Sequence, residues 1–554
     1  MKNTLFYGDN LEVMSTFFGK DAVDLIYLDP PFNSDETYNL MYRNMTGRPV
    51  PESVEAFTDT WSFDDAKRRI ARAMPEMMRE QGIAAEFAEF WQLWVRALEK
   101  ANPRLLAYLI YMTQRLLQMW SMLRPTGSIY VHCDPTASHY IKVVMDAIFQ
   151  HKNFRNEISW KRTGSHGGSR RWGPVHDTIL FYTKGDKYTW NNVYQSYDPS
   201  YIEKAYRNRD ADGRRYQVVS LTGAGVRSGE SGEAWRGVDP SAVGRHWAVP
   251  MKSLQRAYPE TDLSSKGTHE KLDLLDEAGL VYWPKRGEVP RHKRYVDENP
   301  GVLVQDVITD ISALSATSAE RLGYPTQKPS ALLERIIRCS SNPGDVVFDP
   351  FCGCGTTIYA AERTGRKWYG CDIAILPIQK IREELRSKKY GLTEGVNFEV
   401  EGVPNSVESA TELWKRDPFQ FQHWFVELVK GYPMARKVAD GGIDGKLYFS
   451  EKGPEGSVIL EVKGGHVGPA VIRALTGVVV RENAAMGALL TLKNPTPRMR
   501  VEADDAGTVE IDGRQYPRIQ ILSVEEYFEQ DKRLNVPVGR GAHLTEMEQP
   551  ALPF

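Results

Sequence analysis

Short apolar runs alternate with stretches of helical periodicity in the N-terminal part of the chain, up to about position 160. The elements expected there are strands at residues 5–7, 23–28 and 128–132, and helices from about residue 10 and over 140–149. Between residues 66 and 123, apolar side chains recur every three or four positions, which is typical of helices with one buried face. Pro103 lies inside this stretch and should divide it into two helices.

The regular pattern breaks up between about residues 161 and 300, where glycines and prolines separate short aromatic runs. Helical periodicity there is convincing only near 251–257 and 268–278. Alternation then resumes, with helices at 330–339, 356–364 and 375–385 and strands at 346–349 and 367–372. Strand–helix alternation predicts a parallel sheet covered on both faces. The expected fold class is therefore α/β, a doubly wound sheet with an inserted region of loops and small sheets.

These changes of pattern predict four parts of the chain. They are a first half-domain at residues 1–160 with a helical insertion at about 64–123, an inserted region at 161–300, a second half-domain at 301–402, and a small α/β C-terminal domain at 406–554. A chain of 554 residues is long enough for two or three domains that each bury a core.

Composition narrows the class of protein. Hydrophobic residues make up 41% and charged residues 26% of the chain, which is ordinary for a soluble globular protein. No run approaches the roughly 18 uninterrupted apolar residues of a membrane span, and the first residues lack the apolar core of a signal peptide. Five cysteines form neither a disulfide framework nor a CxxC pair, so a reduced, cytoplasmic protein without a membrane partner is expected.

A net charge of −2 means that any nucleic-acid contact must be local. Residues 156–215 contain 11 Lys and Arg against 7 Asp and Glu, interleaved with aromatic residues. Lys161, Arg162, Arg170 and Arg171 are the cations that we expect to contact DNA there. From charge alone, a solvated loop face is an equally good interpretation.

Two short motifs, one near the start of the chain and one close to position 350, suggest where chemistry occurs. The first, Asp29-Pro30-Pro31-Phe32, follows the strand expected at 23–28. A loop of this kind suits an amine that is a poor nucleophile because its lone pair is delocalised into an aromatic ring. The Asp29 carboxylate and the Pro30 carbonyl can accept hydrogen bonds from such an amine, and the prolines stiffen the loop. Phe32 can stack on the flat ring, which for a nucleic-acid base is worth roughly 1–3 kcal/mol.

The second motif is an expected strand, a Gly-rich turn and a helix that begins with Thr356. This sequence of elements is the usual cradle for a nucleotide-like ligand. Gly353 and Gly355 allow the backbone to approach a ligand closely. Asp372 ends the next strand expected after Gly355, where an acid can accept both hydroxyl groups of a ribose. Cys352 and Cys354 are better explained as small residues in the turn than as metal ligands.

The two motifs, with Tyr324-Pro325-Thr326-Gln327-Lys328-Pro329 just before the second, resemble those of the beta class of DNA amino-methyltransferases, in which the catalytic motif precedes the cofactor motif. The resemblance covers roughly residues 1–400. It includes methyltransferase subunits of type III restriction systems as well as stand-alone adenine and cytosine N-methyltransferases. It implies S-adenosylmethionine as the cofactor and double-stranded DNA as the partner.

The same resemblance assigns further residues to the S-adenosylmethionine site. They are Asp349, Pro350 and Phe351 together with Gly353 and Gly355, Thr326, Gln327 and Lys328 at the methionine end, and Asp9 at the pocket. Asp9 is explained equally well as a helix N-cap. Members of the class favour Asp before Pro-Pro for adenine and Ser for cytosine, so Asp29 favours adenine N6 over cytosine N4.

The C-terminal domain contains a second set of polar residues. Asp444 follows a turn, and Glu461 and Lys463 alternate on an apolar strand, which puts them on one face. Two carboxylates can bind Mg²⁺ while the lysine holds a water or the phosphate. The set resembles the Mrr-like branch of the PD-(D/E)xK nucleases, and Glu427 matches that family's helical acid. Two surface strands with ordinary charges are the alternative.

The sequence thus predicts a site-specific DNA methyltransferase with an inserted target-recognition region and a nuclease-like domain. Four alternatives stay open: an N4-cytosine enzyme, a single-chain restriction enzyme with Mg²⁺-dependent cleavage, a solitary methyltransferase with a non-cleaving DNA-docking tail, and a non-enzymatic DNA-binding protein. A homodimer or a separate restriction subunit is compatible with each enzyme. No Walker-A sequence occurs in the chain, so we expect no ATP-driven translocase in it.

Overall fold

The computed structural model describes residues 2–30, 63–133, 137–164, 172–285, 289–315, 317–322, 327–434, 442–449 and 456–537. Contacts between residues divide the chain into two compact units. Unit 1 comprises Met1–Asn191 and Gln305–Phe554, and unit 2 comprises Asn192–Val304. Residues 161–191 of the expected inserted region therefore belong to unit 1.

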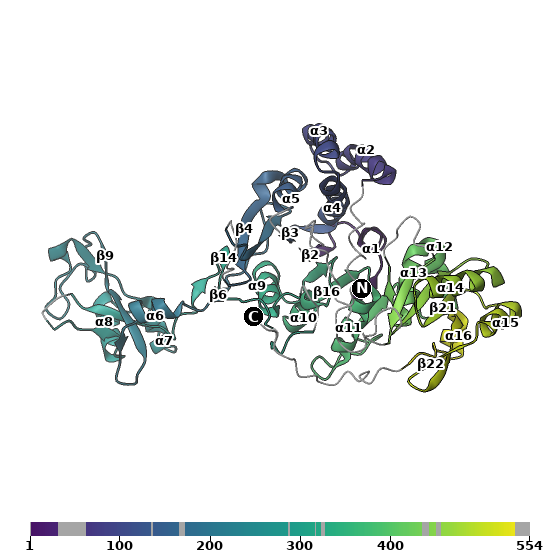
Figure 1. Cartoon of the computed structure of the whole chain (residues 1–554). Helices are drawn as coiled ribbons and strands as arrows, with labels where there is room; N and C mark the ends of the chain where they lie inside the picture. The colour runs from purple at the N-terminus through teal and green to yellow at the C-terminus, as the bar shows by residue number, and fades with distance from the viewer. Residues whose placement is uncertain are drawn as a thin grey trace. The chain divides into compact units, whose positions relative to one another are not determined.

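In unit 1 the described residues form a nine-stranded sheet in the order β14-β4-β5-β3-β2-β15-β16-β1-β17 (Figure 1). The strands are β1 (Asn3–Tyr7), β2 (Val23–Leu28), β3 (Leu123–Cys133), β4 (Phe154–Lys161), β5 (His176–Thr183), β14 (Val307–Ile308), β15 (Val346–Asp349), β16 (Lys367–Asp372) and β17 (Phe398–Glu401). Only β5 runs antiparallel to its neighbours among these strands. The expected doubly wound α/β sheet is confirmed.

Helices cover both faces of this sheet because buried apolar side chains alternate along the strands. Leu5 and Tyr7 lie in one apolar cluster, and Phe6 between them lies in the other. The first face is covered by α9 (Ser330–Ser340), α10 (Thr356–Arg363) and α11 (Ile375–Arg386), and the second by α1 (Asn10–Phe17), α4 (Pro103–Met122) and α5 (Ser138–Met145). Figure 1 shows α1 and α4 on the opposite side of the sheet from α10 and α11.

The helical stretch before β3 consists of three helices, so the expectation of two was wrong. They are α2 (Asp65–Glu80), α3 (Ala85–Ala101) and α4. Gly82 has a φ of 76°, the left-handed conformation that commonly ends a helix, and this break after α2 was not foreseen. Pro103 does start a new helix, where the Asn102 side chain caps the backbone of Leu105.

Two further boundaries differ from the expected ones. β3 begins at Leu123 rather than 128, because Leu123 already pairs with Val23 of β2. The helix expected over 140–149 ends as an α-helix at Met145 and continues as a π-helical turn, Asp146–Gln150. The Asn153 side chain donates to the Phe149 carbonyl at 2.7 Å and so takes up one of the carbonyls at the end of that turn.

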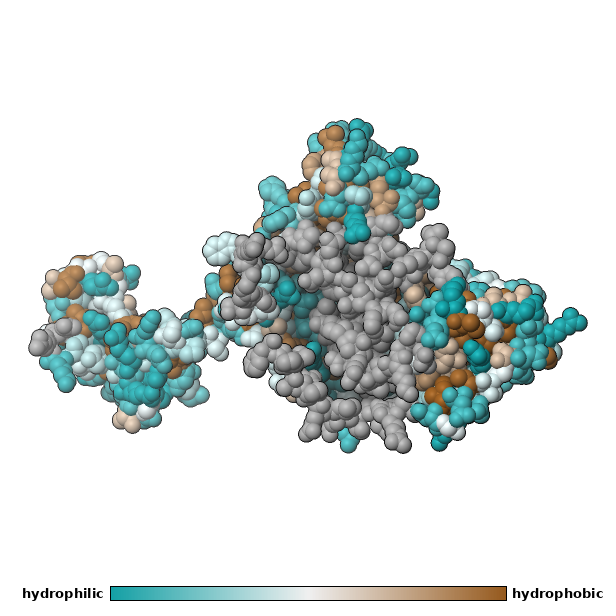
Figure 2. Space-filling view, in the orientation of Figure 1, coloured by the Kyte–Doolittle hydropathy of each residue, from teal (hydrophilic) through white to brown (hydrophobic). Residues whose placement is uncertain are grey.

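Unit 2 consists of short elements around a small core, as expected for the inserted region. A four-stranded sheet has the order β11-β12-β8-β7, and two-stranded pairs accompany it. The elements are β6 (Tyr194–Gln195), α6 (Pro199–Ala205), β7 (Asn208–Arg209), β8 (Arg215–Ser220), β9 (Thr222–Ala224), β10 (Arg245–Trp247), α7 (Met251–Ala257), α8 (Thr268–Glu277), β11 (Val281–Tyr282), β12 (Arg291–Tyr295) and β13 (Val302–Leu303). Trp235, Trp247 and Leu272 are buried in its core. On the face in Figure 2, hydrophilic residues prevail over this unit and hydrophobic ones form small separate areas.

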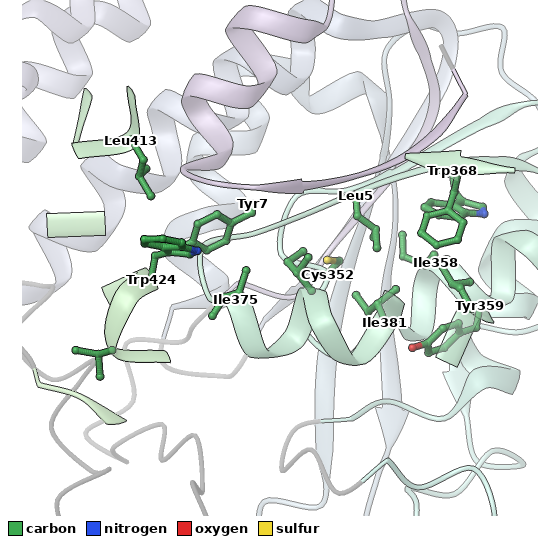
Figure 3. Close-up of a cluster of buried hydrophobic side chains, with 14 of the residues drawn as sticks. Leu5, Tyr7, Cys352, Ile358, Tyr359, Trp368, Ile375, Ile381, Leu413 and Trp424 are labelled. Atoms are coloured by element: carbon green, nitrogen blue, oxygen red, sulfur yellow. The ribbon is translucent and has the colours of Figure 1, made fainter. Parts of the chain in front are cut away.

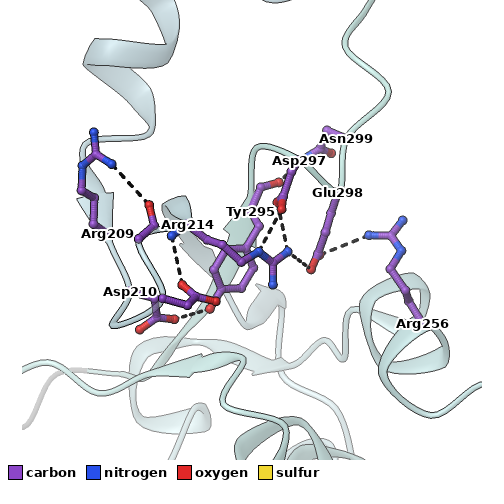
Figure 4. A network of polar contacts seen from close by, with 10 residues as sticks. Arg209, Asp210, Arg214, Arg256, Tyr295, Asp297, Glu298 and Asn299 are labelled. Atoms are coloured by element: carbon purple, nitrogen blue, oxygen red, sulfur yellow. Dashed lines mark hydrogen bonds and ion pairs between the residues drawn. The ribbon is translucent and has the colours of Figure 1, made fainter.

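A network of charges fixes the end of the four-stranded sheet in unit 2 (Figure 4). Arg214 pairs with Asp297 and with Glu298, at 2.9 Å in each case. Glu298 also pairs with Arg256 of α7 at 3.1 Å. The Arg214 guanidinium lies 4.0 Å from the centre of the Tyr295 ring. These contacts join β8, β12 and α7, three elements that are far apart in the sequence.

The C-terminal region, residues 407–537, contains a second α/β sheet. Its strands have the order β18-β19-β20-β21-β24. The elements are α12 (Val407–Arg416), α13 (Pro418–Leu428), β18 (Tyr432–Pro433), β19 (Gly445–Tyr448), β20 (Ser457–Lys463), α14 (Pro469–Arg481), β21 (Met486–Thr491), α15 (Pro497–Asp505), β22 (Thr508–Ile511), β23 (Arg514–Pro517), β24 (Ile519–Ser523) and α16 (Val524–Glu529). One apolar cluster runs from the large sheet through α12 and α13 to β20. In the described part of the chain, no helix is long and apolar enough to cross a membrane.

Candidate active site

The two motifs that are far apart in the sequence lie next to each other in the sheet. β2 and β15 are parallel neighbours, with Leu25 opposite Val347 and Ile26 opposite Phe348. Asp29 follows the carboxyl end of β2, and Asp349 is the last residue of β15. Ligands of open α/β sheets bind outside the carboxyl ends of the strands, which is where both motifs lie.

Asp29 forms an ion pair with Lys328 and keeps one oxygen atom unpaired. The Lys328 ammonium contacts Asp29 Oδ2, and the two side chains are 11% and 17% exposed, respectively. Asp29 Oδ1 is buried and has no hydrogen-bond partner among the described residues. Such a buried acceptor can receive a hydrogen bond from a ligand or from a water molecule. Pro30 is buried, whereas Pro31, Phe32 and Thr326 lie outside the described residues.

Gln327 holds the chain next to Lys328. Its Oε1 accepts from the Leu322 backbone N–H at 2.7 Å, and its Nε2 donates to the Glu320 carbonyl at 2.7 Å. Both polar atoms of the amide are therefore used within the loop. Gln327 stabilises the approach to Lys328, and Lys328 makes the contact with Asp29.

A row of polar side chains crosses four adjacent strands near the end of β2. The Tyr27 hydroxyl on β2 lies 3.0 Å from His132 Nδ1 on β3, and His132 Nε2 lies 3.1 Å from Asp177 Oδ2 on β5. Arg162, directly after β4, reaches Asp177 Oδ1 at 3.1 Å. His132 and Asp177 are buried. We call Tyr27, His132, Asp177 and Arg162 the cross-strand row.

The charges around the cross-strand row favour an ionised Asp177. Burial alone would raise the pKa of Asp177, but the hydrogen bond with His132 and the positive charges of Arg162 and Lys328 lower it below its usual value. Lys328 thus acts electrostatically on Asp29 and on Asp177. Sequence reasoning assigned no role to His132 or Asp177. The available signal was a polar residue within an apolar strand on each of β3 and β5.

The Gly-rich turn after β15 requires its glycines. Gly355 has a φ of 87°, and a Cβ atom there would lie 2.6 Å from Cγ1 of Ile381. Gly353 has a φ of 48°. Both lie in the left-handed region, which glycine adopts without steric cost. Thr356, the first residue of α10, is buried directly behind the turn.

Asp372 closes the turn from the neighbouring strand. One carboxylate oxygen accepts from the Gly353 backbone N–H at 3.0 Å and the other from the Ala374 N–H at 2.9 Å. Burial raises the pKa of Asp372 to about 6. A carboxylate oxygen has a second lone pair, so each oxygen can still accept a ribose hydroxyl. This geometry fits the expected role of Asp372.

Asp349 differs from Asp372 because it is buried, and each of its oxygens accepts one hydrogen bond from within the turn. They accept from the Phe351 backbone N–H at 3.0 Å and from the Thr357 hydroxyl at 2.5 Å. Burial raises the pKa of Asp349 to about 7. Asp349 therefore stabilises the turn that would hold a ligand. The ring of Phe351, expected near an adenosine, has its centre 6.4 Å from that of Tyr111.

Asp9 is both a helix cap and part of a charged pair. Its Oδ1 accepts from the Leu11 backbone N–H at 2.7 Å, and its Oδ2 pairs with Arg115 at 2.6 Å. Arg115 also donates to Asn10 at 2.5 Å, and Asn10 donates to the Pro350 carbonyl at 2.8 Å. Sequence reasoning missed Arg115, although an arginine deep within the apolar helix α4 was a visible signal.

The expected DNA contacts are only partly within the described residues. Lys161 ends β4 and is exposed. Arg162 is about half exposed but already pairs with Asp177. Arg170 and Arg171 lie outside the described residues. Trp172, which follows them, is 97% exposed, so an aromatic side chain is available to solvent beside this basic stretch.

In the C-terminal region, the structure brings Asp444, Glu461 and Lys463 together. Lys463 Nζ lies 3.0 Å from Glu461 Oε1 and 4.0 Å from Asp444 Oδ2. Asp444 Oδ2 also accepts from the Val462 backbone N–H at 2.7 Å. Among the described residues no group of three or more His, Cys, Asp or Glu side chains is arranged for a metal. Oxygen ligands suit Mg²⁺, so the two carboxylates fit it if water or phosphate supplies the other positions.

Glu427, the expected helical acid of this set, is engaged elsewhere. It is 4% exposed, and its Oε2 accepts from the Ile375 backbone N–H of α11 at 2.9 Å. The residue of α13 that contacts Asp444 is Gln422, whose side-chain amide reaches Asp444 Oδ1. Residues five positions apart on a helix lie on different sides of it.

Curated relatives are modification enzymes of restriction systems. The Type II methyltransferase M.EcaI of Enterobacter cloacae is 32% identical over 308 residues, which cover 55% of this chain and 62% of the relative. The Mod subunit of the type III restriction-modification enzyme StyLTI of Salmonella typhimurium is 24% identical over 377 residues, which cover 65% of this chain and 49% of the relative. The chain thus spans less than two thirds of the length of either relative.

Alignments with two solved structures cover about 70% of this chain, with low identities and TM-scores. The PvuII DNA methyltransferase (cytosine-N4-specific) is 13% identical, with 70% of this chain and 88% of that chain covered and a TM-score of 0.34. The complex of M1.HpyAVI with S-adenosylmethionine is 14% identical. The alignment covers 69% of this chain and 100% of that chain, with a TM-score of 0.29.

Two family profiles match different parts of the sequence. The restriction endonuclease profile of the Mrr catalytic type matches residues 413–515, which include Asp444, Glu461 and Lys463. The DNA methylase profile of N6 and N4 methyltransferases matches residues 23–381, well over half of the chain. That match begins at β2 and ends within α11, so it spans both motifs at the carboxyl edge of the large sheet. The chain belongs to the DNA methylase family of N6 and N4 methyltransferases.

Proposed function

We propose that this protein transfers a methyl group from S-adenosylmethionine to the exocyclic amine of a base in double-stranded DNA, and that the base is adenine. The observation that supports this best is Asp29 Oδ1, a buried acceptor with no partner among the described residues, directly after β2. Family membership and the Gly-rich turn on the adjacent strand agree with it.

Asp29 would act on the amine by position and charge. Its Oδ1 accepts one N–H of the amine, and the Pro30 carbonyl can accept the other. This weakens delocalisation of the nitrogen lone pair into the ring. Lys328 holds Oδ2 and keeps the carboxylate in place. The nitrogen would form a bond to the methyl carbon while the bond between that carbon and the sulfur breaks, so that the electron pair stays on the sulfur and neutralises its charge. The amine would then release one proton. Because the Lys328 ammonium already balances the charge of the carboxylate through Oδ2, we assign that proton to solvent.

Residues of the turn would bind the other substrate. When bound, S-adenosylmethionine supplies the methyl group on a positively charged sulfur. Asp372 would accept the ribose hydroxyls, and Gly353 and Gly355 let the backbone approach the ligand. Asp349 holds the turn in shape through Thr357 and the Phe351 N–H.

The test is the identity of the modified base. Full-length protein is incubated with unmethylated DNA and labelled S-adenosylmethionine, and the digested product is analysed by mass spectrometry. We expect N6-methyladenine. N4-methylcytosine alone would contradict the choice of adenine, and the absence of any methylated base across many DNA sources would contradict methyl transfer itself.

A second activity, Mg²⁺-dependent cleavage of unmethylated DNA, has support of its own. The observation that favours it is the contact of Lys463 with Glu461 and Asp444 within the stretch that matches the restriction endonuclease profile. Asp444 and Glu461 would hold Mg²⁺, which would stabilise charge on the scissile phosphate, and Lys463 would hold the attacking water. A tail that only docks on DNA is the alternative.

We also propose a cytoplasmic location, because the substrate is DNA. The mass of the protein in solution tests for a homodimer, and the cleavage assay tests whether a separate restriction subunit is needed. If this chain cleaves alone, it contains its own restriction activity. If it methylates but never cleaves, a separate subunit is the better explanation, as the name of the StyLTI Mod subunit indicates for that relative.

A further inference from the structure

The helix α13 of the C-terminal region touches the first turn of α11 in the large sheet. Glu427 Oε2 accepts from the Ile375 backbone N–H at 2.9 Å in a buried contact. The N-cap of α11 is Ala374, and no side chain of its own segment caps this helix. Glu427, 52 residues further along the chain, thus satisfies one of the N–H groups that a helix start leaves open. Its carboxylate also lies where negative charge stabilises a helix.

This helix start is part of the turn that holds Asp372. Ala374 donates to one oxygen of Asp372, and Ile375 is the next residue. The other oxygen of Asp372 accepts from Gly353 in the Gly-rich turn. A shift of Ile375 would therefore move the carboxylate that we assign to the ribose. Glu427 thus acts on Asp372 through the backbone of two adjacent residues.

A second contact of α13 reaches β1. Tyr7, the last residue of β1, is buried, and burial together with the charge of nearby Glu427 raises its pKa well above the usual value. The next residue, Gly8, donates to the Asp372 carbonyl at 3.0 Å. Figure 3 shows Tyr7, Ile375 and Trp424 of α13 side by side in one apolar cluster. α13 thus supports both strand ends that flank the pocket.

We propose that Glu427 is a positioning residue of the S-adenosylmethionine site, so that the C-terminal region forms part of the methyltransferase's cofactor pocket. This inference rests on the proposed function. It means that affinity for S-adenosylmethionine depends on a helix of the nuclease-like region, and that a ligand in the pocket in turn stabilises the position of α13.

The experiment compares full-length variants by isothermal titration with S-adenosylmethionine and by steady-state kinetics. Loss of a helix cap predicts that Glu427→Ala weakens binding about fivefold. Its KM for the cofactor should rise by the same factor while kcat at saturation stays near the original value. Glu427→Gln keeps an oxygen acceptor for Ile375 but loses the charge. Its affinity for S-adenosylmethionine should therefore lie between those of the original protein and of Glu427→Ala.

Glu526 provides the matched control. It is also a buried carboxylate that caps a helix of the same region, since it accepts from the Ser523 backbone N–H at 3.0 Å at the start of α16. Glu526→Ala should lower the melting temperature without changing the affinity for S-adenosylmethionine. A general loss of stability in the region would affect both alanine variants alike, and that result would overturn the proposal.

Two other outcomes separate this inference from the proposed function. If Glu427→Ala binds S-adenosylmethionine as tightly as the original protein, the positioning role is wrong although the methyltransferase assignment stands. The same holds if Glu427→Gln only abolishes Mg²⁺-dependent cleavage, because Glu427 would then be a nuclease acid. If the original protein itself binds no S-adenosylmethionine, the proposed function fails.

Discussion

Three aspartates at the ends of neighbouring strands have different environments and therefore different tasks. Asp29 has an unpaired oxygen directed at no described residue, Asp372 shares each oxygen with one backbone N–H, and Asp349 uses both oxygens within its turn. The same side chain can thus serve a substrate, a ligand or the backbone. Each oxygen of Asp349 and of Asp372 accepts one hydrogen bond, so exposure distinguishes these two residues: Asp349 is buried, whereas Asp372 is partly exposed and can be reached by a ligand.

Removal of the Asp29 carboxylate should stop methyl transfer but not cofactor binding. Asp29→Ala deletes the acceptor for the amine, and losing one such preorganised group typically costs about a hundredfold or more in rate. Of the proposed cofactor residues that the structure describes, only Lys328 pairs with Asp29, and the Gly-rich turn and Asp372 follow other strands, so the dissociation constant of S-adenosylmethionine should change little. Filter binding of labelled DNA measures the first quantity and calorimetry the second. Near-normal methylation by the variant would show that the active site lies elsewhere.

Affinity for S-adenosylmethionine should fall at acidic pH. The pKa of Asp372 is raised to about 6, so below this pH the carboxyl is protonated and loses acceptor capacity for the ribose hydroxyls. The dissociation constant should rise as pH decreases, by up to about tenfold per pH unit. Calorimetry from pH 5 to 8 (about the range in which this group titrates) measures it. In Asp372→Asn the dissociation constant should depend less steeply on pH, with only the contribution of Asp349 remaining. An unchanged pH dependence would exclude Asp372 as the titrating group.

At the scale of elements, the cross-strand row connects four strands through side chains rather than backbone. Asp177 on β5 contacts His132 on β3 and Arg162 next to β4, and His132 contacts Tyr27 on β2. Strand β2 leads directly to Asp29. The row therefore relates the position of Arg162 directly after β4 to the position of Asp29 directly after β2.

Asp177→Asn should weaken this connection. The substitution keeps the shape of the side chain but removes the charge that Arg162 and Lys328 face, and a hydrogen bond to a charged group contributes about 2 kcal/mol. We expect a lower melting temperature and a lower kcat, with unchanged binding of S-adenosylmethionine. Arg162→Gln serves as the control for loss of the exposed partner alone. A fully active Asp177→Asn variant would mean that the row has only a structural role.

Part of the large sheet and its helices was predictable because the signals are local, whereas strands β4, β5, β14 and β17 were not expected and β5 lies in the stretch expected as the inserted region. Apolar runs identified β1, β2, β15 and β16, and helical periodicity identified α9, α10 and α11 to within one or two residues. The extra break at Gly82 was missed because a single left-handed glycine in a polar segment has little periodic signal. The start of β3 was missed because pairing with Val23, rather than the pattern of residues 123–127, determines it.

The candidate site was predictable only where one motif contains the residues. Asp29, Gly353, Gly355 and Asp372 follow from strand ends and turns. Arg115 and Asp177 do not, because their partners lie on elements about 100 and 45 positions away, respectively. For Glu427 the residue was identified from the sequence but its contact was not. Its type and helical position matched a family acid, yet its hydrogen-bond partner Ile375 became visible only in three dimensions.

At the scale of the whole molecule, unit 1 contains both candidate sites on separate sheets. Asp29 follows the carboxyl end of β2, an interior strand of the nine-stranded sheet, and Lys463 ends β20 in the five-stranded sheet. A continuous apolar cluster joins the two sheets through α12 and α13. The two sites use different residues for their proposed chemistry, although both sheets pack against the same apolar cluster.

Lys463→Ala should therefore remove DNA cleavage and leave methylation intact. The lysine is 37% exposed, so its truncation should cost little stability. Nicking of unmethylated plasmid with Mg²⁺ or Mn²⁺, and without ATP, measures the first activity, and label transfer measures the second. Cutting that survives in both Lys463→Ala and Asp444→Ala would indicate a contaminant or another site. No cutting by the original protein would favour a tail that only docks on DNA.

The adjacency of β2 and β15 also affects how the protein is made. More than half of the chain separates the two strands, so at roughly 5–20 residues per second the ribosome completes β15 tens of seconds after β2 has emerged. During that delay one edge of β2 has no partner, and unpaired edges are sites of aggregation. Slower expression at low temperature, or an excess of a chaperone that holds nascent chains, should therefore raise the yield of folded protein.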